Sequence, residues 1–251
     1  MWILRCLTVI ILALQLALPA AAQQHYYFRH YQVEDGLSNN TVISIMQDRD
    51  GFMWFGTKEG LNRFDGYQIK VFNLDEDYER SLTKDLIYSL FTDGHGTMWV
   101  GAQKGLYRYE REQERFTRVI DTLRNVYNLQ YDSKGLLWFI ADHSVCNYEL
   151  KTGQVKRFPK DRYFMANTLC VAGDGNIWVG TSAGDLQCFD RATQTFRAYN
   201  MFSHSPAVGS CFMEALLPVG PQTIFVGTSC QGVKQFDIAT RTYKDILTYN
   251  P

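Results

Sequence analysis

The sequence predicts an all-β protein made of about five copies of a four-stranded unit. Three observations carry this prediction: a tryptophan-centred motif recurs every 39 to 47 residues, short apolar runs flank it, and turns rich in Gly, Asp and Asn join the runs. Aromatic residues make up 14% of the chain, and aromatic side chains fit the pleated, half-buried surface of a strand. A four-stranded unit with a period near forty residues is the signature of a propeller blade, so we expect a β-propeller of about five blades.

The motif reads DRDGFMWFGT at 48–57 and returns as DGHGTMWVGA at 93–102, DSKGLLWFIA at 132–141 and GDGNIWVGTS at 173–182. A fifth copy, QTIFVGTSCQGVKQFD at 222–237, has phenylalanine at the tryptophan position. Each blade of a propeller stacks between two neighbours, so both of its faces must be apolar, and a Trp side chain supplies a large apolar area there. We interpret five residues as structural members of the repeat: Trp54, Trp99, Trp138, Trp178 and Phe225.

The expected repeats follow an N-terminal segment at 23–35 and lie at about 36–72, 80–119, 121–158, 163–199 and 207–247. Each begins with an apolar strand, and a Gly-containing turn then leads into the Trp strand in the first four copies. An aspartate opens this turn in the first three copies, at Asp48, Asp93 and Asp132. We interpret these carboxylates as turn formers, because Asp side chains hydrogen-bond the backbone of their own turn.

The first 22 residues have the features of a signal peptide. Arg5 is followed by an apolar run of 12 residues, 7–18, and then by small residues that fit a cleavage site between Ala22 and Gln23. The alternative is an uncleaved membrane anchor, but a helix needs about 20 apolar residues to span a bilayer. No later segment is apolar enough to cross a membrane, so we expect a mature protein in the periplasm.

The composition argues against several classes of function. With 25 basic and 26 acidic residues the formal net charge is −1, which gives no basic footprint for nucleic acid. The five histidines occupy unrelated positions of the repeat and no C-x-x-C pair occurs, so we expect no metal site and no cofactor. We also expect no catalytic residues.

Two of the cysteines are placed to form a disulfide. Cys211 precedes the first strand of the fifth copy, and Cys230 lies in the turn between its second and third strands. In an antiparallel four-stranded blade these two segments lie at the same ends of the strands. A disulfide is therefore a hypothesis, which requires the two Cα atoms to lie within about 7 Å and an oxidising compartment.

One segment carries a family resemblance. GLSNNTVISIMQDRDGFMWFGTKEGLNRFDGYQIKVF, at 36–72, resembles the first propeller repeat in the periplasmic sensor region of hybrid two-component histidine kinases, bacterial sensors associated with polysaccharide utilisation. YYFRHYQVEDG, at 26–36, is similar to the mature N-terminus of such sensors. The later copies match more loosely, since Ile140 replaces a glycine in the third and Phe225 replaces the Trp in the fifth.

The resemblance implies an extracytoplasmic sensory role and a seven-bladed type of propeller. We therefore expect five blades to form an open or partial propeller, with a closed five-bladed ring as the alternative. Further blades or sensor subunits are expected partners. No phosphoacceptor helix, ATP lid, receiver or helix-turn-helix is recognisable in the sequence, so we assign no kinase activity to this chain.

The expected ligand is an oligosaccharide. Propellers commonly bind at the edge formed by the segments before each first strand and the turns between second and third strands, because loops vary while strands pack. Asn125 lies on this edge, as do the ten candidate ligand-binding residues: Asn39, Asn40, Lys58, Glu59, Gln103, Lys104, Tyr127, Asp142, His143 and Tyr163. A non-catalytic protein-interaction propeller is the alternative function, and a propeller lyase or hydrolase is the third.

Overall fold

The computed structural model describes residues 2, 27–72, 85–120, 122–158, 165–202 and 211–247. Contacts between residues divide the chain into two compact units, Met1–Tyr31 and Gln32–Pro251, and every strand of the described residues belongs to the second. The predicted signal peptide and the candidate residue Tyr163 lie outside the described residues.

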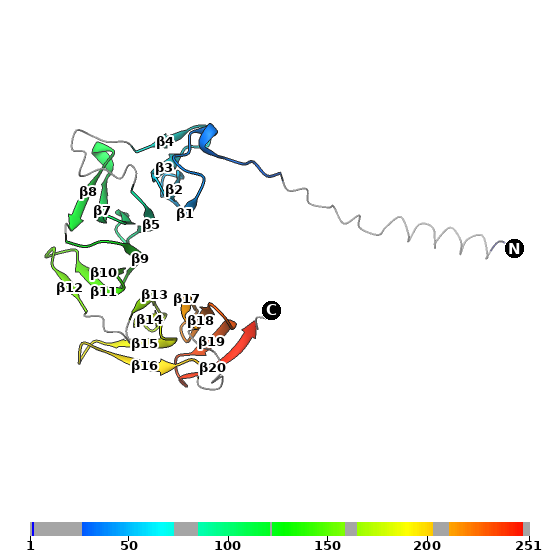
Figure 1. Ribbon diagram of the computed structural model, residues 1–251, viewed down its shortest axis with the longest axis vertical. Helices are drawn as coiled ribbons and strands as arrows, with labels where there is room; N and C mark the ends of the chain where they lie inside the picture. The colour runs from blue at the N-terminus through cyan, green and yellow to red at the C-terminus, as the bar shows by residue number, and fades with distance from the viewer. Residues whose placement is uncertain are drawn as a thin grey trace. The chain divides into compact units, whose positions relative to one another are not determined.

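In its described residues the second unit contains five antiparallel sheets of four strands, each in sequential order (Figure 1). The first sheet consists of β1 (Val42–Gln47), β2 (Met53–Thr57), β3 (Gly60–Phe64) and β4 (Ile69–Val71). The second consists of β5 (Ile87–Thr92), β6 (Met98–Ala102), β7 (Gly105–Glu110) and β8 (Arg115–Ile120). The third consists of β9 (Val126–Tyr131), β10 (Leu136–Ala141), β11 (Ser144–Glu149) and β12 (Val155–Arg157). The fourth consists of β13 (Ala166–Val171), β14 (Ile177–Thr181), β15 (Asp185–Asp190) and β16 (Thr195–Asn200). The fifth consists of β17 (Met213–Val219), β18 (Thr223–Thr228), β19 (Gly232–Asp237) and β20 (Thr242–Leu247). Short 3-10 helices lie at Val33–Asp35 and Arg111–Gln113. The predicted all-β fold of four-stranded units is confirmed.

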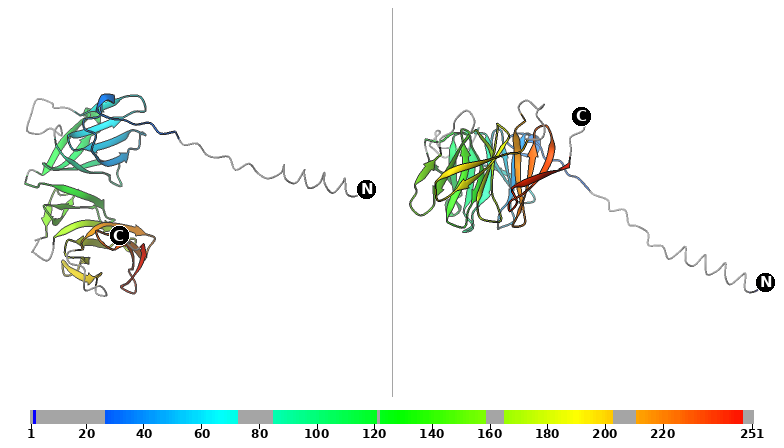
Figure 2. Two further views of the ribbon diagram at one scale, coloured as in Figure 1. Left: turned by 45° about the vertical axis from the view of Figure 1, so that its right-hand side comes forward. Right: turned by 90° about the horizontal axis from the view of Figure 1, so that it is seen from below.

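Consecutive sheets pack through their first strands (Figure 2). β1 contacts β5, β5 contacts β9, β9 contacts β13 and β13 contacts β17. Among the residues that the structure describes, such packing does not join the fifth sheet to the first. The sheets therefore form an open succession of blades, as expected, and the alternative of a closed five-bladed ring is wrong for this structure.

The tryptophan strands provide the packing between sheets. Trp54, Trp99, Trp138 and Trp178 are at most 2% exposed, and each contacts aromatic side chains of the following sheet. At the first interface the Trp54 ring stacks on Phe72 at 5.0 Å and meets Tyr109 edge-on at 5.3 Å. These offset and edge-on arrangements are the ones that aromatic quadrupoles favour. The structural interpretation of the four tryptophans agrees with these positions.

The aspartates do more than form turns. In the first three sheets one carboxylate oxygen accepts two backbone N–H groups of the turn, while the other accepts the indole N–H of the Trp. The indole bonds measure 2.8, 2.8 and 2.9 Å in the pairs Asp48–Trp54, Asp93–Trp99 and Asp132–Trp138. One carboxylate therefore fixes both the turn and the orientation of the ring that packs between sheets.

The glycine two residues after each Trp allows the next sheet to approach. A Cβ atom on Gly101 would lie 2.5 Å from the Val126 carbonyl oxygen of β9, which is far inside van der Waals contact. In the third sheet this glycine is replaced by Ile140, and the residue facing it at the start of β13 is Ala166, smaller than Val126. Both are fully buried in one cluster, so a smaller partner accommodates the larger side chain.

The outer faces of the first and fifth sheets are uncovered among the described residues. Ile45 on β1 is 61% exposed and Leu217 on β17 is 59% exposed. Phe225 pairs with Leu217 as Trp54 pairs with Met46, which confirms its register, but it is only half-buried. A Cβ atom on Gly227 would meet only Ala215 of its own sheet, at 3.6 Å. The apolar repeat pattern thus continues onto a face that no other described element covers.

Candidate functional site

One edge of the unit is built from the segments named as the candidate ligand face. In four sheets a backbone N–H of the turn between the second and third strands donates to the segment before the first strand, at 2.9–3.2 Å. The donors and acceptors are Lys58 and Thr41, Gln103 and Leu86, Ser182 and Met165, and Ser229 and Phe212. Consecutive sheets are linked at the same edge, where Asn125 N–H donates to the Gln103 carbonyl and Ala166 N–H to the His143 carbonyl, both at 2.9 Å.

A cluster of aromatic and polar side chains lies at this edge across the second and third sheets. Asn125 accepts the Tyr88 hydroxyl at 3.3 Å and donates its amide to Asp142 at 2.8 Å. The Tyr127 hydroxyl donates to the Ala166 carbonyl at 3.1 Å and lies 3.2 Å from Nδ1 of His143. The rings of Tyr88 and Tyr127 are 6.1 Å apart.

The repeat explains why these groups meet. Ile87 and Val126 take the same position opposite the Trp strand in their sheets, so Tyr88 and Tyr127, the next residues, are equivalent. Asn125, Asp142 and His143 all have left-handed backbone conformations, with φ of 49°, 47° and 61°. Asn, Asp and His tolerate this region better than most residues, and such conformations concentrate at ligand sites.

The hydroxyls of this cluster remain protonated at neutral pH. Burial raises the pKa of Tyr127 to about 12, and the charges of Tyr88 and Asp142 add to the effect. Burial also raises the pKa of Tyr88, with Asp85 and Asp142 contributing. Each hydroxyl donates its proton within the protein, to Asn125 or to Ala166, while its oxygen can still accept beside an aromatic face.

Asp85 is a buried carboxyl at the same edge. It is fully buried, one oxygen accepts Lys104 N–H at 3.3 Å, and the other has no hydrogen-bond partner. Burial raises its pKa to about 6, against the opposing effect of the Lys104 and Arg118 charges. A buried, partly hydrogen-bonded carboxyl with a raised pKa is the kind of group that accompanies ligand sites.

The structure gathers some of the predicted residues and separates others. Tyr127, Asp142 and His143 lie in the cluster. The Gln103 carbonyl accepts the Asn125 N–H beside it, and the Lys104 N–H donates to the Asp85 carboxylate. The side-chain oxygens of Asn39 and Asn40 accept backbone N–H groups of nearby residues, at 2.8 and 2.9 Å, and so stabilise local structure. Lys58 and Glu59 are exposed on the turn of the first sheet.

Tyr88 was missed by the sequence analysis, although it lies one copy before Tyr127 at the same repeat position. Aligning the copies by their Trp strands would have placed it.

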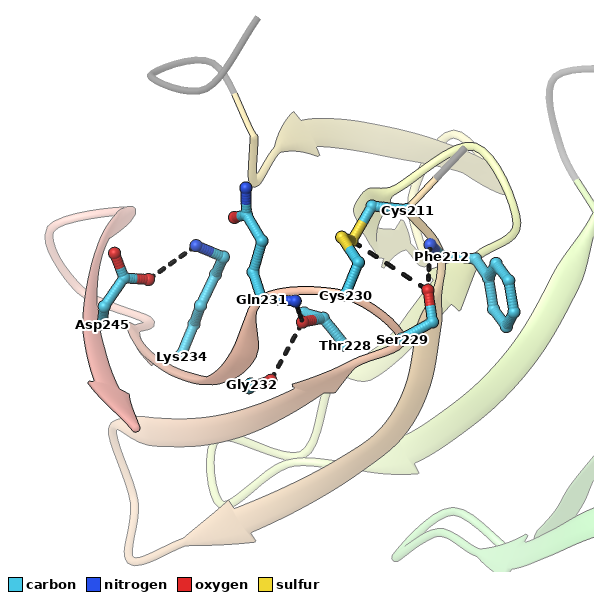
Figure 3. The surroundings of a disulfide bond; sticks show 9 residues. All are labelled: Cys211, Phe212, Thr228, Ser229, Cys230, Gln231, Gly232, Lys234 and Asp245. Carbon is cyan, nitrogen blue, oxygen red and sulfur yellow. Dashed lines mark hydrogen bonds and ion pairs between the residues drawn. A yellow bond between two sulfur atoms is a disulfide. The ribbon is translucent and has the colours of Figure 1, made fainter. Parts of the chain in front are cut away.

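The predicted disulfide between Cys211 and Cys230 is present, with the Cα atoms 5.6 Å apart (Figure 3). It ties the segment before β17 to the turn between β18 and β19, at the same edge as the cluster. Phe212 N–H donates to Ser229 Oγ at 3.1 Å beside it. The free cysteines among the described residues are Cys146, Cys170 and Cys188, the first two buried.

Two concavities lie away from this cluster. One of about 160 Å³ lies between the first and second sheets and is lined by Arg49, His95 and Arg111 among others. The second, of about 410 Å³, lies between the fourth and fifth sheets and is lined by Tyr199, Arg241 and Tyr243 among others.

Two negative findings apply to the described part of the chain. It holds no group of three or more His, Cys, Asp or Glu side chains arranged for a metal ion. No helix within it is long and apolar enough to span a membrane.

Comparisons of the sequence give a short match. The family model described as "Two component regulator propeller" matches residues 36–59. Histidine kinase P4 of Formosa agariphila is 38% identical over 69 residues, which are 27% of this chain and 5% of the kinase. The chain thus matches a small part of that curated relative.

Comparisons of the structure extend over most of the chain. The extracellular domain of a hybrid two component system of B. thetaiotaomicron superposes with a TM-score of 0.71 at 21% identity, over 83% of this chain and 28% of that chain. Virginiamycin B lyase from Staphylococcus aureus superposes with a TM-score of 0.64 at 9% identity, over 86% of this chain and 72% of that chain. At these identities the likeness concerns the fold alone. The chain is a β-propeller in which residues 36–59 match the two-component regulator propeller model, and its fold resembles that of the extracellular domain of a hybrid two-component system.

Proposed function

We propose that this chain is the sensory, ligand-binding propeller of a two-component signalling protein, that it acts in the periplasm and that its ligand is an oligosaccharide. The regulator-propeller match at 36–59 and the similarity to a histidine kinase support the signalling context. The disulfide supports an extracytoplasmic location, because disulfides persist in oxidising compartments.

The observation that carries the ligand proposal is the cluster of Tyr88, Tyr127 and His143 with Asn125 and Asp142. Saccharides present hydroxyl groups, which amide, carboxylate and phenol groups hydrogen-bond, and C–H faces, which stack on aromatic rings. The cluster offers both within one edge, and backbone hydrogen bonds hold its segments in place. Rigid support of this kind lowers the entropic cost of binding.

We propose a binding role rather than catalysis for this cluster. Virginiamycin B lyase shares the fold at 9% identity, which gives no ground for transferring its activity. The tyrosine hydroxyls stay protonated because burial raises their pKa, so neither is poised as a base near neutral pH.

The test is a thermal-shift screen of the purified chain against a panel of oligosaccharides. A ligand that binds only the folded state at 100 times its Kd adds about 2.7 kcal/mol, which corresponds to a Tm increase of roughly 5–10 °C for a protein of this size. His143→Ala should abolish the shift produced by the active oligosaccharide.

His95→Ala is the matched control. His95 contacts Tyr131 at 3.3 Å much as His143 contacts Tyr127, but it lies in the turn between β5 and β6, at the other ends of the strands. This variant should keep the full shift. Equal loss in both variants, or no shift with any oligosaccharide, would contradict the proposed site.

A further inference from the structure

The interface between the fourth and fifth sheets lacks the carboxylate found at the three earlier interfaces. Ala172 takes the place of Asp132: its N–H donates to the Asn176 carbonyl at 2.9 Å, as Asp132 N–H donates to the Leu136 carbonyl at 3.0 Å. Trp178 Nε1 is buried and has no hydrogen-bond partner. A buried hydrogen-bond donor without a partner lowers stability, so an acceptor placed beside this N–H would stabilise the interface.

An arginine at the same interface is also without a carboxylate. Arg241 lies over the Trp178 ring at 5.0 Å and over the Tyr199 ring at 5.5 Å. At the preceding interface Arg191 lies over Trp138 at 5.9 Å and forms an ion pair with Asp132 at 2.8 Å. Within the described ranges Arg241 forms no ion pair.

The nearby aspartates do not replace the missing partner. Asp174 accepts the backbone and side-chain N–H groups of Asn176, at 3.0 and 2.8 Å. Asp190 accepts the N–H groups of Ala192 and Thr193, at 2.8 and 3.2 Å. Both carboxylates are therefore engaged in their own turns.

A groove lies beside Arg241, at the outer side of this interface. The concavity of about 410 Å³ is lined by Arg241 together with Tyr199, Tyr243, Phe236 and Asn200. At the third interface the residues at the two tyrosine positions are Phe158 and Phe196, so the fourth interface has two hydroxyls where its neighbour has bare rings. Arg241 supplies a planar cation that pairs well with carboxylates.

We propose that the groove between β16 and β20 binds a ligand carboxylate carried on a ring, with Arg241 as its cation. The carboxylate pairs with Arg241 as Asp132 pairs with Arg191 at the preceding interface, and the ring lies between Tyr199 and Tyr243. This site is separate from the oligosaccharide cluster and does not rest on the function proposed for it.

The test compares sodium D-glucuronate with D-glucose in a thermal-shift assay at constant ionic strength. The two sugars share a ring and differ in the carboxylate. Glucuronate in several-fold excess over its Kd should raise Tm by about 2–4 °C, and glucose should not. Acetate at the same concentration should have a smaller effect, and an equal effect would overturn the assignment of a ring to the groove.

Two variants, with a third as their control, decide where the carboxylate binds. Arg241→Gln should abolish the glucuronate shift, whereas Arg197→Gln, which removes an exposed charge from β16, should keep it. Ala172→Asp should supply the missing carboxylate from within the fold, raise Tm and reduce the glucuronate shift. An unchanged shift in Arg241→Gln, or in a folded Ala172→Asp, would overturn the proposal.

Nuclear magnetic resonance gives a readout that does not depend on stability. The indole N–H resonance of Trp178 should move on addition of glucuronate, while that of Trp138, already bonded to Asp132, should not. A Trp178 resonance that does not respond would count against the site even if Tm rises.

Discussion

The glycine two residues after the Trp position gives a sharp test of how the sheets pack, because in two copies it has different surroundings. A Cβ atom on Gly101 would lie 2.5 Å from the Val126 carbonyl oxygen and 2.6 Å from Ser89 Oγ. The first of these is backbone and cannot rotate away. A Cβ atom on Gly227, at the same repeat position, would meet only Ala215 at 3.6 Å, which is ordinary contact.

We therefore expect Gly101→Ala to destabilise the protein and Gly227→Ala to be neutral or mildly stabilising. Overpacking costs about 1–3 kcal/mol, which for a chain of this size lowers Tm by roughly 3–9 °C. Where no clash occurs, replacing a strand glycine by alanine gains about 0.5–1 kcal/mol through the lower entropy of the unfolded chain. Neither glycine has a positive φ, so backbone strain does not enter the comparison.

The assay is urea unfolding of the two variants and the parent chain, followed by tryptophan fluorescence and by circular dichroism. If the two probes give the same transition, a two-state model can be used to calculate the free energy of unfolding. The midpoint should fall for Gly101→Ala alone, with an unchanged slope against urea. Equal destabilisation in both variants would refute the reasoning, because it would mean that the glycines serve the strand itself rather than the approach of the next sheet.

Three further predictions concern buried charges and the disulfide. The folded pKa of Asp85 is about 6, above its ordinary value of 3.8, so its contribution to stability is full at low pH and is lost as the pH rises through 6. Asp85→Asn should consequently raise Tm at pH 7.5, by the equivalent of at most about 3 kcal/mol, and change it little at pH 4. Burial raises the pKa of Asp132, but its hydrogen bonds, led by that from Arg191, outweigh burial and hold the pKa below 3.8. Its stabilisation is therefore present above that pH and lost in acid, and Asp132→Ala should cost about 2–4 kcal/mol at pH 7 in urea unfolding but less at pH 3. Replacing Cys211 and Cys230 by Ser should cost about 2–4 kcal/mol and make Tm insensitive to reductant, which should lower the Tm of the parent chain. A parent Tm unaffected by reductant would contradict the last prediction.

The sequence could predict where the candidate site lies but not which residues form it. That Tyr127, Asp142 and His143 lie on the same side follows from strand direction alone. Successive turns of an antiparallel sheet lie alternately at one end of the strands and at the other. Tyr88 was missed because it was treated as part of an apolar strand, and Asn39 was included although its side chain serves the local turn. Which polar side chains meet depends on contacts between copies about forty residues apart, and no local pattern contains that information.

The sequence by itself determined the number of sheets, their strand order and the burial of the four tryptophans, and it placed Cys211 and Cys230 at the same ends of the strands. All of these follow from a period of about forty residues and from the alternation of strand direction within one copy. Only the tertiary structure decided the fit between Ile140 and Ala166, the indole bonds of Asp48 and its equivalents, and the unpaired N–H of Trp178. These features depend on how closely one sheet approaches the next, and packing against a neighbouring face fixes that distance, whereas a strand pattern fixes only which residues face outward.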